Sequence, residues 1–78
     1  MPQLILYTTS HCHLCGQAEA ILLALHQQHD ITWNAVEIST DDALMEKYGT
    51  TIPVVKNCHN DQELNWPFSA EDIVQLIT

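Results

Sequence analysis

The residues of this chain best suited to chemistry are Cys12 and Cys15, two cysteines separated by two residues. An apolar, strand-like run at 4–7 comes just before them, and a helix-like run at 17–28 comes just after. Such a junction places the first sulfur at a helix N-terminus, where unpaired N–H groups and the helix dipole stabilise a thiolate. We therefore expect Cys12 to be an exposed nucleophile of thiol–disulfide exchange and Cys15, one turn further on, to be the shielded resolving thiol.

Two histidines, His11 and His13, flank the first cysteine. A protonated imidazole could lower the pKa of the Cys12 thiol or relay a proton. The alternative is that both are exposed polar residues of a turn, and we favour it because exchange does not require a histidine between the cysteines. Both interpretations stay open at this point.

The segment Thr51-Ile52-Pro53 is the second candidate part of the site. A proline within an apolar strand removes a backbone donor and needs a reason. If the Ile52–Pro53 bond is cis, the start of that strand can lie beside the cysteines and offer the backbone of Ile52 to a substrate chain. The alternative is a trans proline that begins an edge strand, and residues alone favour it because only about 5–6% of X–Pro bonds are cis.

The elements that would position these residues follow the order β-α-β-α-β-β-α. Mixed apolar and polar residues in the second strand suit an edge position, and the first βαβ unit should be parallel with a right-handed crossover. The first helix should bury Leu14, Ala18, Ile21, Leu22 and Leu25. The predicted strands are 3–8, 31–38, 51–56 and 62–65, and the predicted helices are 13–29, a short one capped by Ser39 or Thr40 and stopped by a left-handed Gly49, and one capped by Ser69.

Composition limits the class of protein and its partners. With 78 residues, the chain is expected to be one domain spanning 1–78 and a monomer. The net charge of −8 leaves no basic patch, which argues against nucleic acid and anionic membranes and favours a basic protein partner. No membrane-spanning run and no signal pattern is present, and three cysteines do not make a disulfide framework, so we expect a cytoplasmic protein.

The strand, the Cys12-His13-Leu14-Cys15 segment, the helix and Thr51-Ile52-Pro53-Val54 about forty residues later resemble the glutaredoxins and the wider thioredoxin-fold group. The likeness covers essentially the whole chain. The residues Tyr7, Leu44, Tyr48-Gly49 and Trp66-Pro67-Phe68 are most similar to a small bacterial glutaredoxin-like family long catalogued as a domain of unknown function. The resemblance implies an α/β three-layer sandwich with a four-stranded mixed sheet and helices on both faces. It also implies a cis Pro53 that faces the cysteines.

Two departures from the glutaredoxins bear on glutathione. The usual basic residue before the cysteine pair is replaced by His11, and the usual Gly-Gly turn before the last helix is replaced by Trp66-Pro67. Asp72 could supply one acidic contact, but helix capping also explains it. We therefore predict no cofactor and do not expect glutathione to be the favoured partner.

Hairpin geometry should bring the loop at Trp66 near the cysteines. There the indole could form an apolar rim for a protein substrate or a lid over the small core, and both roles remain open. The same geometry carries Cys58 roughly 16 Å beyond Pro53 along an extended strand, so it should be a bystander.

Three functions compete on these residues. The first is a thiol–disulfide oxidoreductase that acts on a protein or small-thiol disulfide and is reduced again by an unidentified reductant. The second is a module that binds zinc or Cu(I) through Cys12 and Cys15, although Cys58-His59 should lie too far away to complete a site, and no metal site is predicted. The third is a non-catalytic binding domain with the thioredoxin fold.

Overall fold

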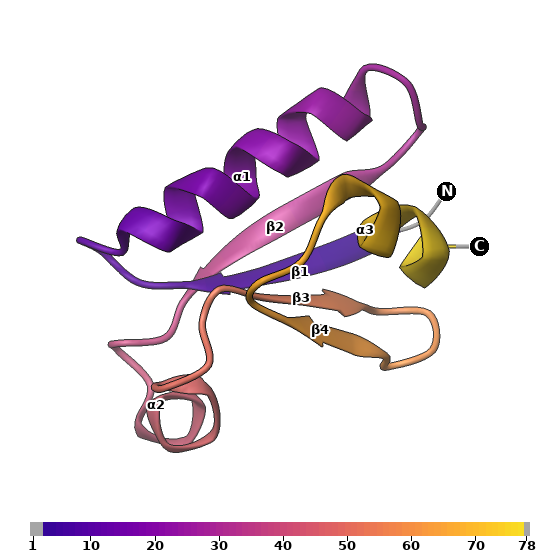
Figure 1. Ribbon diagram of the computed structural model, residues 1–78. Coiled ribbons are helices and arrows are strands. Elements are labelled where there is room, and N and C mark those ends of the chain that lie inside the picture. Colours follow the sequence, from indigo (N-terminus) through magenta and orange to yellow (C-terminus); the bar gives the residue numbers. More distant parts are fainter. Residues whose placement is uncertain (1–2, 78) are drawn as a thin grey trace.

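A computed structural model describes residues 3–77 and contains the predicted order of elements (Figure 1). The apolar run before the cysteines forms a strand, and the helix begins directly after Cys12. The strands are β1 (Gln3–Thr8), β2 (Thr32–Glu37), β3 (Val54–Asn57) and β4 (Glu63–Asn65), and the helices are α1 (His13–His26), α2 (Asp42–Tyr48) and α3 (Ala70–Ile77).

The four strands form one mixed sheet in the order β2-β1-β3-β4. β1 pairs in parallel with β2 and antiparallel with β3, and β3 and β4 form a hairpin. Tyr7 lies opposite Val54, which in turn lies opposite Asn65. The end of β1, the start of β3 and the end of β4 therefore lie side by side at one end of the sheet. The predicted parallel βαβ unit, the hairpin and the position of β2 as an edge strand are confirmed.

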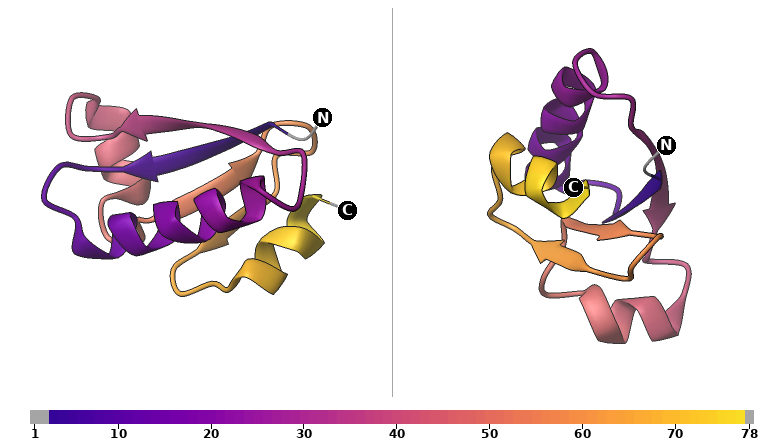
Figure 2. Two further views of the ribbon diagram at one scale, coloured as in Figure 1. Left: turned by 90° about the horizontal axis from the view of Figure 1, so that it is seen from above. Right: turned by 90° about the vertical axis from the view of Figure 1, so that its right-hand side faces the viewer.

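Helices cover both faces of the sheet, with α1 and α3 on one face and α2 on the other (Figure 2). Successive strand residues point to opposite faces, so Leu6 faces the α1 layer while Tyr7 faces α2. On the α2 face, Tyr7 stacks on the buried Tyr48 with ring centroids 4.2 Å apart. The predicted three-layer α/β sandwich is confirmed. The larger core contains Leu4, Leu6, Ala18, Leu22, Leu25, Ile31, Val55, Phe68, Ile73 and Leu76.

The buried face of α1 differs from the predicted one. Cys15 is buried with Ala18, Leu22 and Leu25. Leu14 was expected in this stripe but is 41% exposed, because the buried face centres on Ala18 and Leu22 and Leu14 lies at its flank. The helix also ends at His26 rather than at residue 29.

Both ends of α2 differ from the prediction. The N-cap is Asp41, not Ser39 or Thr40, and its Oδ1 accepts the N–H groups of Ala43 at 2.9 Å and Leu44 at 3.1 Å. Gly49 is right-handed, with a φ of −55°, because its N–H continues the helical pattern to the carbonyl of residue 45 instead of reversing it.

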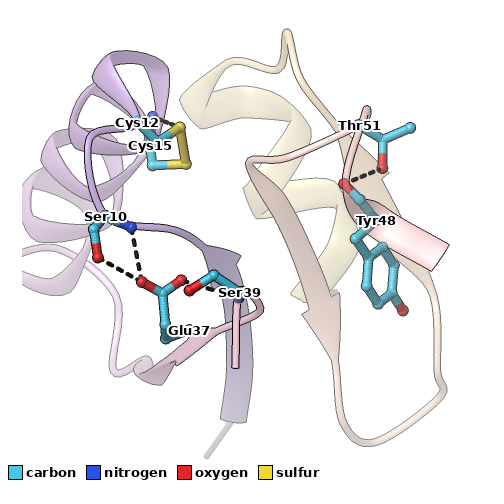
Figure 3. The surroundings of a disulfide bond; sticks show 7 residues. All are labelled: Ser10, Cys12, Cys15, Glu37, Ser39, Tyr48 and Thr51. Atoms are coloured by element: carbon cyan, nitrogen blue, oxygen red, sulfur yellow. Dashed lines mark hydrogen bonds between the residues drawn. A yellow bond between two sulfur atoms is a disulfide. The ribbon is translucent and has the colours of Figure 1, made fainter. Parts of the chain in front are cut away.

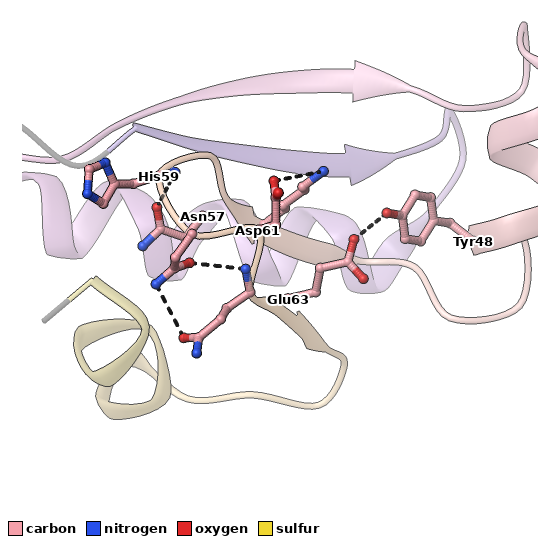
Figure 4. Close-up of polar contacts among 8 residues, drawn as sticks. Tyr48, Asn57, His59, Asp61 and Glu63 are labelled. Carbon is pink, nitrogen blue, oxygen red and sulfur yellow. Dashed lines mark hydrogen bonds and ion pairs between the residues drawn. The ribbon is translucent and has the colours of Figure 1, made fainter.

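Two polar devices hold α3 in place. Ser69 caps the helix as predicted: its Oγ accepts the N–H of Asp72 at 3.2 Å, and the Asp72 carboxylate accepts the N–H of Ser69 at 2.9 Å. At the other end, the buried Asn57 donates from Nδ2 to the Leu76 carbonyl at 2.9 Å. Its side-chain oxygen accepts the His59 N–H at 2.9 Å (Figure 4). Within 3–77, no helix has the length and apolar character needed to cross a membrane.

Candidate redox site

Cys12 and Cys15 are joined by a disulfide at the start of α1 (Figure 3). Their Cα atoms are 5.2 Å apart, which is within the range of ordinary disulfides. Cys12 is half-buried, whereas Cys15 is only 4% exposed. This order of exposure agrees with the prediction that Cys12 is the more accessible thiol.

The sulfur of Cys12 occupies the capping position of the helix. Cys12 has an extended backbone, with φ −92° and ψ 104°, and its Sγ accepts the N–H of Cys15 at 3.1 Å. In most helices a serine or aspartate oxygen fills this role. A thiolate on Cys12 would therefore be stabilised by a backbone donor and by the positive end of the helix dipole.

The loop before Cys12 is fixed by Glu37 at the end of β2 (Figure 3). One carboxylate oxygen accepts the N–H of Ser10 at 2.8 Å and its hydroxyl at 2.7 Å, and the other accepts the N–H of Ser39 at 3.4 Å. The hydroxyl of Ser10, followed by its N–H, lowers the pKa of Glu37 to about 2. This carboxylate is therefore ionised at neutral pH and ties the loop to the neighbouring strand.

Sequence reasoning missed this role, because the mixed apolar and polar residues of the strand that contains Glu37 indicated only an edge position. The available signal was its position. Glu37 pairs with Thr8 at the ends of two parallel strands, and polar residues at such ends meet at one edge of the sheet.

Both predicted histidines lie at the surface on either side of Cys12. His11 has a φ of 66°, a left-handed conformation that is uncommon for residues other than glycine. Within residues 3–77, neither imidazole makes a hydrogen bond. Their influence on Cys12 stays a prediction.

The Ile52–Pro53 bond is cis, as the resemblance implied and against the base rate. The carbonyl of Tyr48 accepts three hydrogen bonds from this segment: the N–H of Thr51 at 2.9 Å, the N–H of Ile52 at 3.1 Å and the Thr51 hydroxyl at 3.3 Å. These bonds explain why β3 begins at Val54 and not at residue 51. They also correct the expectation for Ile52, because its N–H is occupied and its carbonyl remains as the backbone group for a substrate chain.

Trp66 lies beside the cis proline. Its N–H donates to the carbonyl of Pro53 at 3.1 Å, and its ring meets Phe68 edge-on with centroids 5.1 Å apart. The indole is half-buried and packs against the larger core, and the Trp66–Pro67 bond is also cis. The loop therefore lies at the expected edge of the sheet, while a contact between Trp66 and a substrate stays a prediction.

An open cleft runs along α1 beside the disulfide. This cleft was not predicted from the sequence. The available signal was the spacing of Glu19, which follows Cys15 by four residues and therefore lies on the same side of the helix. Besides the cysteines and histidines already described, the lining of the cleft contains Thr8, Thr9, Gly16 and Glu19.

Cys58 is an exposed, free cysteine at the opposite end of β1. Its N–H donates to the carbonyl of Gln3 at 3.0 Å, at the first residue of β1, whereas Cys12 follows the last residue of that strand. The prediction that Cys58 lies far from the pair is confirmed. Within the described part of the chain, no group of three or more His, Cys, Asp or Glu residues could hold a metal ion.

Comparisons with known proteins agree with this architecture. No curated protein matches the chain. The solved structure of a structural-genomics target protein from X. campestris is 37% identical, covers 90% of this chain and 88% of its own, and has a TM-score of 0.73.

Two more distant structures bear on the fold alone. Protein Ne2328 from Nitrosomonas europaea is 23% identical over 99% of this chain and 92% of its own, with a TM-score of 0.86. Trichomonas vaginalis thioredoxin is 18% identical over 95% of this chain and 71% of its own, with a TM-score of 0.54. The model of the Glutaredoxin-like domain (DUF836) family matches residues 3–78. The chain therefore belongs to the glutaredoxin-like domain (DUF836) family.

Proposed function

We propose that this protein is a dithiol oxidoreductase in which Cys12 is the nucleophile and Cys15 is the resolving thiol. The observation that carries the proposal is the position of the Cys12 sulfur. It caps α1, accepts the Cys15 N–H at 3.1 Å and pairs with a sulfur that is shielded from solvent.

The reaction needs only the two thiols and a substrate disulfide. The Cys12 thiolate attacks one substrate sulfur, a Cys12–substrate disulfide forms, and the other substrate sulfur leaves as a thiolate that takes up a proton. Cys15 then loses its proton and attacks Cys12, which forms the Cys12–Cys15 disulfide and releases the second substrate thiolate. Two electrons pass to the substrate, and a separate thiol or dithiol reductant must return the protein to its dithiol form.

Each feature of the site supports one step of this reaction. The helix N-terminus stabilises Cys12 as a thiolate both when it attacks and when Cys15 displaces the substrate. His11 and His13 lie at the surface next to Cys12, where they can exchange protons with leaving thiolates. At the start of β3 and the end of β4, the Ile52 carbonyl and the Trp66 indole lie beside Pro53, where they would contact a protein substrate. We propose a reducing, cytoplasmic setting because exchange in this direction consumes the dithiol.

The experiment is trapping of the mixed disulfide, with every variant in a Cys58→Ser background so that only the pair reacts. Reduced Cys15→Ser protein, mixed with a disulfide substrate, should accumulate the substrate covalently on Cys12, as seen by intact mass and peptide mapping. Cys12→Ser is the matched control and should trap little, because Cys15 is buried. Equal trapping by the two variants, or none by either, would refute the proposal.

A further inference from the structure

Gly16 lies in the second turn of α1, and the fold does not explain why it is glycine. Its backbone is helical, and no glycine in 3–77 has a positive φ. A Cβ added at Gly16 would meet no other atom within 4 Å. Neither conformation nor packing requires glycine here, and glycine weakens a helix interior. What its missing side chain does leave is an open cleft beside Cys12.

Glu19 gives that cleft its charge. Cys12, Gly16 and Glu19 recur at intervals of four and three residues, so they follow one face of α1. Of the residues that line the cleft, Glu19 is the one that carries a full charge when histidine is neutral. It is exposed, and no ion pair reaches it within residues 3–77.

The two lysines of the chain are engaged elsewhere. Lys56 pairs with Asp61 at 3.5 Å (Figure 4), and the Lys47 ammonium lies 5.1 Å from the ring centroid of Tyr48. The carboxylate of Glu19 is thus left to attract a cation from a partner, in a protein whose net charge is already −8.

We infer that the preferred substrate is a polypeptide disulfide flanked by lysine or arginine, an inference that rests on the proposed exchange at Cys12. The substrate chain crosses Cys12, passes over the bare surface at Gly16 and places its basic side chain at Glu19. Glu19 is seven positions after Cys12, which corresponds to a helical rise of about 10 Å. A basic residue two or three positions from the substrate cysteine spans that distance.

The shape of the cleft favours a polypeptide over a small cationic thiol. Sites for small molecules usually enclose most of the ligand, whereas this cleft is open to solvent along α1.

The test compares two synthetic peptide disulfides that differ only in flanking lysine or glutamate. First-turnover rates of the reduced Cys58→Ser protein are measured by acid quench and mass spectrometry, and the lysine-to-glutamate rate ratio is compared between variants so that intrinsic peptide reactivity cancels. Glu19→Gln should lower this ratio by about threefold to tenfold at low ionic strength, the effect of one charge at close range. The difference should shrink as salt rises to about 1 M.

Asp30→Asn is the matched control, because it removes the same charge from an exposed residue past the other end of α1. It should leave the rate ratio close to that of the parent. If Asp30→Asn lowers the ratio as much as Glu19→Gln, or if Glu19→Gln leaves it unchanged, the inference is wrong although exchange stands. If cystamine, a small cationic disulfide, reacts as fast as the lysine peptide, the polypeptide assignment is wrong. If no disulfide oxidises the reduced protein, the proposed function itself fails.

Discussion

Glu37 holds Ser10 by two hydrogen bonds to one carboxylate oxygen, from the backbone N–H at 2.8 Å and from the hydroxyl at 2.7 Å. Ser10 is two residues before Cys12, and the residue between them, His11, is left-handed. The short loop that delivers the sulfur to the helix start is therefore anchored to the edge strand β2. We regard Glu37 as a positioning residue for Cys12.

Replacement of Glu37 by glutamine is expected to slow exchange at Cys12 several-fold. The amide keeps one acceptor oxygen but loses the charge that strengthens both bonds to Ser10. The check is the rate of disulfide exchange together with the redox potential of the Cys12–Cys15 pair, which a purely structural role far from the site would not shift. Glu46→Gln, at an exposed position of α2, is the control. Equal exchange rates and equal redox potentials in the parent and Glu37→Gln would show that the hydrogen bonds between Glu37 and Ser10 do not position the sulfur of Cys12.

The same carboxylate predicts a pH dependence of stability. The pKa of Glu37 falls from 4.5 to about 2 on folding, chiefly through the Ser10 hydroxyl. A group with a depressed folded pKa stabilises the protein above its unfolded pKa, and this contribution is lost as pH falls through the folded value. The stability difference between the parent and Glu37→Gln should therefore be constant above about pH 5 and decline toward pH 2. Urea unfolding across this range measures it, and a difference that does not change with pH would contradict the assignment.

On the α2 face, Tyr48 donates its hydroxyl to Glu63 of the edge strand β4 (Figure 4). Burial, followed by this bond, raises the pKa of Tyr48. Tyr48→Phe keeps the stack on Tyr7 but removes the donor, and should lower the free energy of unfolding by about 1 kcal/mol. Glu63→Gln retains an acceptor and should cost less. Denaturant unfolding of both variants measures the two changes in the free energy of unfolding. A larger decrease for Glu63→Gln than for Tyr48→Phe would mean that the charge of Glu63 matters more than the hydroxyl of Tyr48.

Two glycines should respond to alanine in opposite directions. Gly16→Ala should raise the free energy of unfolding by about 1 kcal/mol, because helix propensity improves and the added methyl meets no neighbour. Gly49→Ala should destabilise the protein, because its Cβ would run into the backbone carbonyl oxygen of Met45. Thermal unfolding of the pair is the measurement, and a destabilised Gly16→Ala would show that the cleft is packed more tightly than described.

The local sequence predicted those parts of the site that depend on nearby residues. The apolar run before Cys12 and the helix after it sufficed to place that sulfur at a helix start. The cis form of Pro53 came from the family resemblance alone, since local residues favour trans. Three consecutive polar residues precede α2, and any of them can cap a helix, so only the folded chain selects Asp41.

The features that the sequence did not predict depend on contacts between segments that are distant along the chain. Glu37 and Ser10 are 27 residues apart and meet only because β1 and β2 pair in a particular register. The occupied N–H of Ile52 likewise depends on how α2 ends. Leu14 was placed in the core because its helical spacing matches that of the apolar residues at 18, 21, 22 and 25, yet it lies at the flank of the buried face and is 41% exposed.

The measurement that tests the central claim most directly is the pH dependence of alkylation at each cysteine of the reduced protein, in the Cys58→Ser background. Iodoacetamide labelling is quenched at intervals and assigned by peptide mass. We predict that Cys12 reacts first and that its midpoint lies below the value of about 8.5 for a free cysteine, because the helix start stabilises its thiolate. Faster labelling of Cys15, or a Cys12 midpoint equal to that of a free thiol, would contradict the account.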